Sequence, residues 1–217
     1  MSLFTPTGKR DRHKEKKNES HKGSHAREIL TEFRQAYNET EQISGEMEEI
    51  EIKFPVKDTK TITQKLRKLG FRIAVGRHCE MNLLFDDAAG TLQKAGKLLR
   101  IRKTPSGQTI TFKGPISTAS KLKHREEIEC RMEDAGLVQR IFEEVGFRLQ
   151  TQYSKYRTLF EKEGLTVSLD ETEAGNFIEV EGPSDAEVTE LGVQLGYSEQ
   201  DYVRRTYAEL IGERRRS

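Results

Sequence analysis

The sequence has few cysteines, no long apolar run and no Gly-rich phosphate-binding loop, and each absence excludes a class of protein. Cys79 and Cys130 are the only cysteines among 217 residues, which is too few for a disulfide framework or a zinc-type spacing. We therefore expect a reducing, cytoplasmic environment. No apolar stretch approaches the roughly 18 residues of a membrane span. The basic N-terminus also lacks the apolar segment of a signal peptide, and no membrane partner is expected.

Charge is abundant but balanced. Lysine and arginine number 37, aspartate and glutamate 36, and charged residues make up 34% of the chain. A general nucleic-acid-binding protein shows a clear basic excess, so no specific nucleic-acid partner is expected. The balance fits either a salt-bridged surface or an interior that itself contains charges of both signs.

Three regions differ in composition. Residues 1–45 form a basic leader that is too polar at its start to bury much surface, and we expect disorder there. Its second half has apolar residues at helical spacing, which predicts one short helix: Ile29, Leu30, Phe33 and Tyr37. Residues 46–211 form the predicted folded domain and 212–217 a basic tail. The leader either contacts an acidic partner or is simply solvated.

The folded domain has the pattern of strands separated by turns and helices. Strands are predicted at residues 48–54, 77–85, 97–103, 108–113, 124–131, 151–162, 165–171 and 176–181. Helices are predicted at 59–69, 135–145, 185–195 and 203–211. The first three begin after Asp58, Asp134 and Ser184, which are good N-cap residues. This order predicts an α+β domain built on a large antiparallel sheet.

An acidic alternation occurs three times, as Glu49-x-Glu51, Glu127-x-Glu129 and Glu179-x-Glu181. Successive side chains in a strand point to opposite faces, so each pair of carboxylates shares one face and the apolar residue between them takes the other. The same parity, extended to every strand, gathers further charged residues on that face. They are Glu49, Glu51, Glu127, Glu129, Asp170, Glu179 and Glu181, with Lys53, Arg100, Arg102, Lys113, Arg125, Arg131, Lys155 and Arg157.

A solvated polar face is the simplest explanation of such an alternation. Two observations favour a closed sheet instead: acids and bases are grouped by strand, and arginine is preferred to lysine on several strands. In a closed sheet the charged face lines the lumen and the apolar face packs outward against helices. The prediction is therefore an eight-stranded antiparallel closed β-tunnel with a charged lumen and helices outside.

The two charged sets call for different ligands. Carboxylate oxygens suit hard divalent ions such as Mg²⁺ or Mn²⁺. Guanidinium and ammonium groups suit the oxygens of a phosphate chain. Because no Walker-type loop is present, phosphate binding must come from side chains. Together the two sets predict a site for a metal-bound polyphosphate.

The motifs resemble those of the CYTH superfamily, which includes class IV adenylyl cyclase and thiamine triphosphatase and is also called the triphosphate tunnel metalloenzymes. The similarity spans residues 46–211, and Asn82-Leu83-Leu84-Phe85-Asp86 is closest to the bacterial class IV adenylyl cyclase-like branch. The matching elements are Glu49-Ile50-Glu51-Ile52-Lys53, Leu99-Arg100-Ile101-Arg102, Thr111-Phe112-Lys113-Gly114-Pro115, Arg125-Glu126-Glu127-Ile128-Glu129, Lys155-Tyr156-Arg157, Asp170 and Glu179-Val180-Glu181.

The resemblance implies a set of site residues. Ligands for Mg²⁺ or Mn²⁺ would be Glu49, Glu51, Asp170, Glu179 and Glu181. The triphosphate clamp would be Lys53, Arg100, Arg102, Lys113, Lys155 and Arg157, with Lys53 also the candidate catalytic residue. The remaining tunnel residues have no fixed role: Arg125, Glu127, Glu129 and Arg131. Glu127 and Glu129 would either order the clamp or help to bind a second metal.

Three functions are compatible with this set. Hydrolysis of a phosphoanhydride in inorganic, nucleoside or thiamine triphosphate is favoured, because it needs only a positioned water. The alternative is a class IV adenylyl cyclase that converts ATP to cyclic AMP and pyrophosphate. The third is a non-catalytic polyphosphate- or nucleotide-binding module, although binding alone would not need so many carboxylates. The oligomeric state is open, with a homodimer among the alternatives.

Overall fold

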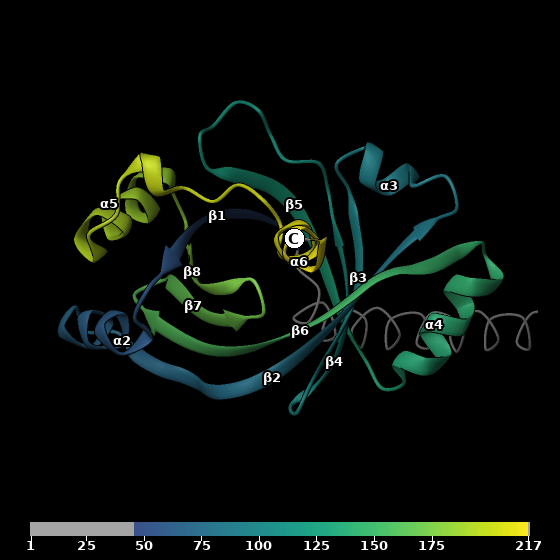
Figure 1. Cartoon of the computed structure of the whole chain (residues 1–217), viewed down its shortest axis with the longest axis horizontal. Helices are drawn as coiled ribbons and strands as arrows, with labels where there is room; N and C mark the ends of the chain where they lie inside the picture. The colour runs from purple at the N-terminus through teal and green to yellow at the C-terminus, as the bar shows by residue number, and fades with distance from the viewer. Residues whose placement is uncertain (1–45, 217) are drawn as a thin grey trace, which may run out of the picture. The chain divides into compact units, whose positions relative to one another are not determined.

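The computed structural model describes residues 46–216, and the predicted leader lies outside them (Figure 1). Eight antiparallel strands close into a barrel in the order β1-β5-β4-β3-β2-β6-β7-β8, and β8 pairs back onto β1. The predicted closed tunnel is therefore confirmed. The strands are β1 (Glu46–Val56), β2 (Arg72–Asp87), β3 (Leu98–Thr104), β4 (Gly107–Lys113), β5 (Lys123–Met132), β6 (Phe147–Lys162), β7 (Leu165–Thr172) and β8 (Gly175–Glu181).

Helices connect the strands and follow the barrel. They are α2 (Thr59–Lys68), α3 (Thr91–Lys94), α4 (Ala135–Glu144), α5 (Asp185–Leu195), the 3₁₀ helix η2 (Glu199–Asp201) and α6 (Tyr207–Arg216). The side chains of Asp58, Asp134 and Ser184 cap α2, α4 and α5 by accepting backbone N–H bonds, as predicted. The short α3 and η2 have no counterpart among the predicted helices. No helix between residues 46 and 216 has both the length and the apolar character needed to cross a membrane.

The last helix begins later than predicted. The backbone N–H of Val203 donates to the carbonyl of Lys53 at 2.9 Å, which holds this segment in an extended conformation against β1. Helix α6 starts only after Thr206, whose backbone N–H and hydroxyl both donate to the carboxylate of Glu209. It continues to Arg216, so most of the predicted basic tail is helical.

The hydrophobic core lies outside the barrel, between strands and helices. Ile50, Ile52 and Phe54 on β1 pack with buried side chains of β7, β8, α2 and α5. On another flank, α4 packs through Ala135, Val138 and Phe142 on the outer faces of β2 and β3; Figure 1 shows α2 and α5 on one flank and α4 on the other. On these two flanks the apolar side of the strands thus faces helices, and the polar side faces the lumen.

Helix α6 is the exception, because it packs on the inner side of the barrel (Figure 1). Tyr207, Leu210 and Ile211 form one buried cluster with Tyr153 of β6 and Phe177 of β8. Phe177 shares the parity of Glu179 and Glu181, so its ring points inward. The helix therefore closes part of one mouth of the barrel with apolar side chains.

Phe54 is one of the most deeply buried side chains of the hydrophobic core outside the barrel. Its ring is 1% exposed, stacks on Tyr197 at 4.4 Å between centroids and meets the edge of Tyr202 at 5.4 Å. We expect Phe54→Ala to lower the free energy of unfolding by about 3–5 kcal/mol, because it leaves a cavity that three elements line. Urea denaturation measures the change. Ile141→Ala, at a position 59% exposed on α4, is the control and should cost less than about 1 kcal/mol.

Candidate functional site

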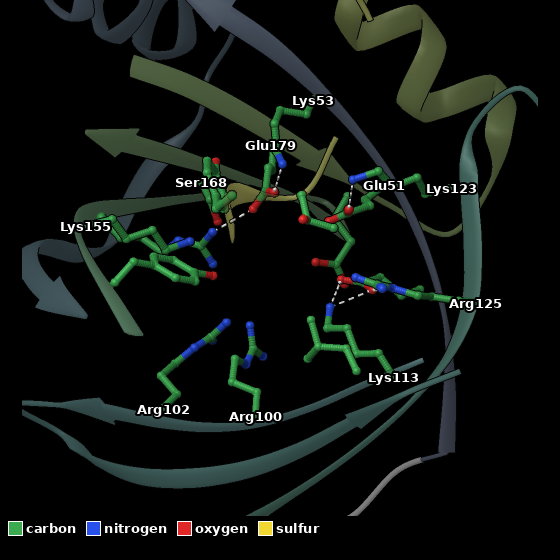
Figure 2. A pocket seen from close by; sticks show the side chains of 17 residues that line it. Glu51, Lys53, Arg100, Arg102, Lys113, Lys123, Arg125, Lys155, Ser168 and Glu179 are labelled. Atoms are coloured by element: carbon green, nitrogen blue, oxygen red, sulfur yellow. Dashed lines mark hydrogen bonds and ion pairs between the residues drawn. The ribbon is translucent and has the colours of Figure 1, made fainter. Parts of the chain in front are cut away.

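A polar cavity occupies the centre of the barrel (Figure 2). It encloses about 640 Å³ of empty space, part of it open to solvent. Eight lysine and arginine side chains and four glutamates line it: Lys53, Arg100, Arg102, Lys113, Lys123, Arg125, Lys155 and Arg157, with Glu49, Glu51, Glu179 and Glu181. The wall thus presents an excess of positive charge, which favours a multiply charged anion as the ligand.

Cross-strand register places most of these charges opposite a partner. Glu49 of β1 faces Arg125 of β5, and Glu51 lies between Lys123 of β5 and Glu181 of β8. Lys113 Nζ contacts both oxygens of Glu49 at 2.6 and 2.7 Å, and Lys123 Nζ contacts Glu51 at 2.9 Å. These pairs are buried, so they are screened less than surface ion pairs.

Glu181 differs from the other cavity glutamates, because the charge of Lys113 only partly offsets its burial. Among the described residues it forms no ion pair, and burial together with Glu49 and Glu51 raises its pKa to about 7. Glu49, Glu51 and Glu181 are neighbouring carboxylates that repel one another. Their oxygens are the ligand type that a hard divalent cation prefers, and the charge of the cation would offset the repulsion. However, no three acidic, histidine or cysteine side chains within the described part of the chain are already grouped to enclose an ion. Glu49 and Glu51 would have to turn from their lysines to do so.

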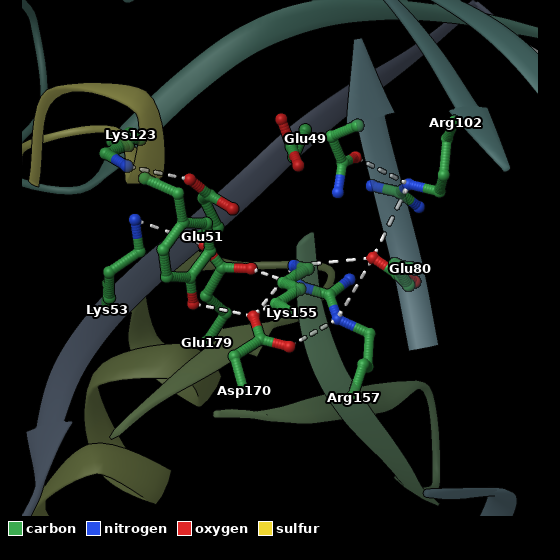
Figure 3. A network of polar contacts seen from close by, with 12 residues as sticks. Glu49, Glu51, Lys53, Glu80, Arg102, Lys123, Lys155, Arg157, Asp170 and Glu179 are labelled. Atoms are coloured by element: carbon green, nitrogen blue, oxygen red, sulfur yellow. Dashed lines mark hydrogen bonds and ion pairs between the residues drawn. The ribbon is translucent and has the colours of Figure 1, made fainter. Parts of the chain in front are cut away.

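Asp170 and Glu179 lie close to several cationic side chains (Figure 3). Arg157 donates to both oxygens of Asp170 at 2.7 and 2.6 Å, and also to Glu179 at 2.6 Å. Lys155 Nζ donates to Asp170 at 2.9 Å, and the Tyr207 hydroxyl donates to it at 2.6 Å. Although burial would raise the pKa of Asp170, Arg157 and Lys155 lower it. These two predicted metal ligands are thus engaged by cations.

Lys53 lies between β1, β8 and the chain segment before α6. Its Nζ donates to the carbonyl of Arg205 at 3.0 Å, lies 3.3 Å from Glu179 and sits 3.9 Å from the centre of the Tyr207 ring. Burial lowers its pKa, although Glu179 opposes this. The ammonium group is therefore fixed in place at the cavity wall, held there in part by Tyr207 of the last helix.

Arg100 and Arg102 point from β3 toward the open centre of the cavity (Figure 2). Arg100 donates to the Thr111 hydroxyl at 3.1 Å, but its buried Nε has no hydrogen-bond partner among the described residues. A buried guanidinium donor without an acceptor is costly. An anion in the cavity would supply the missing acceptor oxygens.

The second acidic alternation supports the clamp from the side. Glu127 lies 2.7 Å from Lys113 Nζ, while Glu129 accepts from the Thr111 hydroxyl at 2.7 Å. Both carboxylates are also within 3.7 Å of Arg100. These contacts favour the clamp-ordering alternative over a second metal. Arg131 is exposed and does not line the cavity, so the structure does not bring it to the other predicted residues.

Glu80 of β2 is a buried carboxylate that the sequence reasoning missed. Its side chain is 4% exposed and lies 3.5 Å from Lys155, 3.6 Å from Arg102 and 3.9 Å from Arg157. Burial alone would raise its pKa, but Arg157, Arg102 and Lys155 together lower it to about 2. Figure 3 shows Glu80 among these cations. It therefore keeps three cavity cations close together.

Other residues of the site were also missed. Lys123 stands one position before the predicted strand and has the parity of Arg125, so a strand longer by one residue would have included it. His78, Glu80 and Asn82 alternate with apolar or neutral side chains, and reading this parity would have found Glu80. Tyr207 carried no strand signal, because it reaches the cavity from a helix that is distant in sequence.

A scan against family models matches residues 47–207 to the CYTH domain. Since that match covers most of the chain, the protein belongs to the CYTH family, as the resemblance predicted. A curated Methanocaldococcus jannaschii protein named "putative adenylate cyclase" is 32% identical over 177 residues, covering 76% of this chain and 99% of the relative.

Two solved structures share the fold. A Vibrio parahaemolyticus protein described as a "putative adenylate cyclase" superposes with a TM-score of 0.69 at 21% identity, covering 77% of this chain and 99% of that one. A Hippeastrum protein described as a "putative adenylyl cyclase" with a dominant triphosphatase activity gives a TM-score of 0.58 at 21% identity, covering 76% and 95%. At these identities the likeness concerns the barrel itself.

The cations around Glu80 make its contribution to the stability of the protein depend on pH. Since its folded pKa is depressed, its contribution to stability is complete above the unfolded value of about 4.3 and is lost as the pH falls toward about 2. Glu80→Gln should therefore be less stable than wild type by about 2–3 kcal/mol at pH 7. The difference should disappear near pH 2.

Thermal or urea unfolding between pH 7 and pH 2 measures this difference. Glu144→Gln, on an exposed position of α4, is the matched control and should follow wild type across the range. If Glu80→Gln were less stable than wild type by the same amount at all pH values, the substitution would act through packing and not through charge.

Proposed function

We propose that this protein is a divalent-metal-dependent enzyme that acts on small-molecule triphosphates, and that it hydrolyses a phosphoanhydride bond. The observation that carries the proposal is the cavity wall, where eight cationic side chains and only four carboxylates face one enclosed space. A triphosphate carries four to five negative charges and many acceptor oxygens, and such a wall suits it. The family and the names of the relatives support the same substrate class.

The clamp residues have distinct parts in this proposal. Arg100 and Arg102 bind phosphate oxygens from β3, and Lys155 and Arg157 bind them from β6. Lys113 adds a point charge from β4. Asp170, Glu80 and Glu127 stay behind the cations and hold them in position, so that they need not reorganise when charge moves in the transition state.

Lys53 is the proposed catalytic residue. Its position is fixed by the Arg205 carbonyl and the Tyr207 ring, and it lies on the same wall as Glu51 and Glu179. A fixed ammonium can stabilise the charge that develops on the leaving phosphate oxygen. No side chain is assigned to activate the attacking water.

Glu49, Glu51 and Glu181 are the proposed metal ligands. Mg²⁺ or Mn²⁺ held there would neutralise charge on the triphosphate oxygens. A cation at this wall would also remove the repulsion that raises the pKa of Glu181. Asp170 and Glu179 are engaged by Arg157, and we assign them to positioning the clamp.

The products distinguish hydrolysis from cyclisation. We expect purified protein incubated with ATP or tripolyphosphate and Mn²⁺ or Mg²⁺ to release orthophosphate, and EDTA to abolish the release. Cyclisation of ATP would instead give cyclic AMP and pyrophosphate in equal amounts, which chromatography of the nucleotides detects. Cyclic AMP as the main product would overturn hydrolysis, and binding without either product would indicate a non-catalytic module.

The carboxylate assignment predicts a specific loss. Glu51→Gln and Glu181→Gln should each lower metal-dependent turnover at least about 100-fold, because a neutral amide is a poor ligand for a hard cation. Both variants should remain folded, since glutamine has the same shape, although Glu51→Gln should be less stable than wild type because it leaves the buried Lys123 without its carboxylate partner. Glu163→Gln, at an exposed turn, is the control. Unchanged turnover in both variants, measured across a range of Mn²⁺ concentrations, would refute the assignment.

A further inference from the structure

Tyr153 is an uncharged side chain in the wall of the charged cavity. It lies on β6 and has the same parity as Lys155 and Arg157, so its side chain points to the inner face of the barrel. Only 7% of the residue is exposed. Tyr153 belongs to none of the charged motifs and has no part in the function proposed above.

The ring of Tyr153 is held by apolar neighbours. It belongs to the buried cluster at α6, together with Phe177, Tyr207, Leu210 and Ile211. The ring centres of Tyr153 and Tyr207 are 6.3 Å apart. Contacts of this kind fix an aromatic ring without using its hydroxyl. The polar end of the side chain is therefore held in one position and stays available to another group.

The hydroxyl of Tyr153 forms no hydrogen bond with any other residue of the described chain. A buried tyrosine normally gives its O–H group a partner, because an unpaired buried donor costs free energy. The fully enclosed polar atoms that lack a partner between residues 46 and 216 do not include this oxygen. It therefore keeps some accessible surface, and for a residue of the cavity wall this surface opens into the cavity.

The surroundings of the hydroxyl favour an anion as its acceptor. Burial raises the pKa of Tyr153 to about 12, although Arg100 and Arg102 oppose this shift, so the hydroxyl stays protonated near neutral pH and acts as a donor. Arg100 and Arg102 reach toward the open centre of the same cavity (Figure 2). The Nε of Arg100 also lacks an acceptor within the described chain. Two donors from different strands thus need an acceptor in one enclosed space.

We propose that Tyr153 is a substrate-binding residue whose hydroxyl donates a hydrogen bond to a phosphate oxygen of the triphosphate. The proposal rests on the function proposed above and adds a neutral donor to the cationic clamp. An O–H group supplies a hydrogen bond without placing a further positive charge beside Arg100 and Arg102. Because apolar packing holds the ring before the substrate arrives, the donor needs no reorganisation on binding.

The substitution Tyr153→Phe removes the hydroxyl and keeps the ring. We expect kcat/KM to fall at least about tenfold for tripolyphosphate and for ATP alike, because hydrogen bonds to charged groups are the stronger ones and both substrates share the phosphate chain. Tyr156→Phe is the matched control. It removes the same group from a position 44% exposed on the outer face of β6, and it should keep the wild-type kinetics.

Stability separates a binding role of the hydroxyl from a structural one. Without ligand, Tyr153→Phe should unfold at the wild-type temperature or slightly above it, since its hydroxyl has no protein partner to lose. Tripolyphosphate should raise the unfolding temperature of Tyr153→Phe less than that of wild type. A clearly lower unfolding temperature of the ligand-free variant would show that the hydroxyl is structural and would overturn the proposal, as would a wild-type kcat/KM.

The test of Tyr153 does not depend on catalysis. If wild type turns over no triphosphate, the function proposed above fails, and calorimetric titration with tripolyphosphate then tests Tyr153 by itself. Binding at least about tenfold weaker in Tyr153→Phe than in wild type supports the assignment. Equal binding by the two proteins, or no binding by wild type, overturns it.

Discussion

The rest of this structure depends on the burial of charges of both signs inside a closed barrel. An unpaired charge in such a place costs several kcal/mol, so each one needs a partner in reach. Cross-strand register supplies many of the partners: Glu49 faces Arg125, Glu51 faces Lys123 and Asp170 faces Arg157. Most inward-facing positions of the strands are thus charged or polar, and the largest hydrophobic cluster forms between the barrel and its helices.

The charged side chains form two layers, and this arrangement gives the cavity wall its excess of positive charge. Lysine and arginine predominate at the surface of the cavity, while Glu80, Asp170 and Glu127 stand behind them. The rear carboxylates offset the repulsion among the cations without reaching the ligand. Four glutamates are the exceptions, because their carboxylates themselves line the cavity: Glu49, Glu51, Glu179 and Glu181.

Much of this could be predicted from the sequence, because strand parity is a local property. The alternation around Glu49, Glu127 and Glu179 fixes which side chains share a face, and the number of such strands favours closure. Parity could not say which carboxylate contacts which base. Asp170 looked equivalent to Glu181 in sequence, yet one accepts from two cations and a tyrosine while the other has no ion pair among the described residues. Those differences arise from register and from a distant helix.

That helix, α6, borders the charged cavity and a second cavity beside it. Tyr207 donates to Asp170 and places its ring beside Lys53 and Lys155, so the first turn of α6 helps to order the clamp. Ala208 and Gly212 of the same helix line the second cavity. The strands supply the charged side chains of the lumen, whereas α6 supplies the tyrosine that contacts three of them. The order of the charged lumen therefore depends on this helix as well as on strand register.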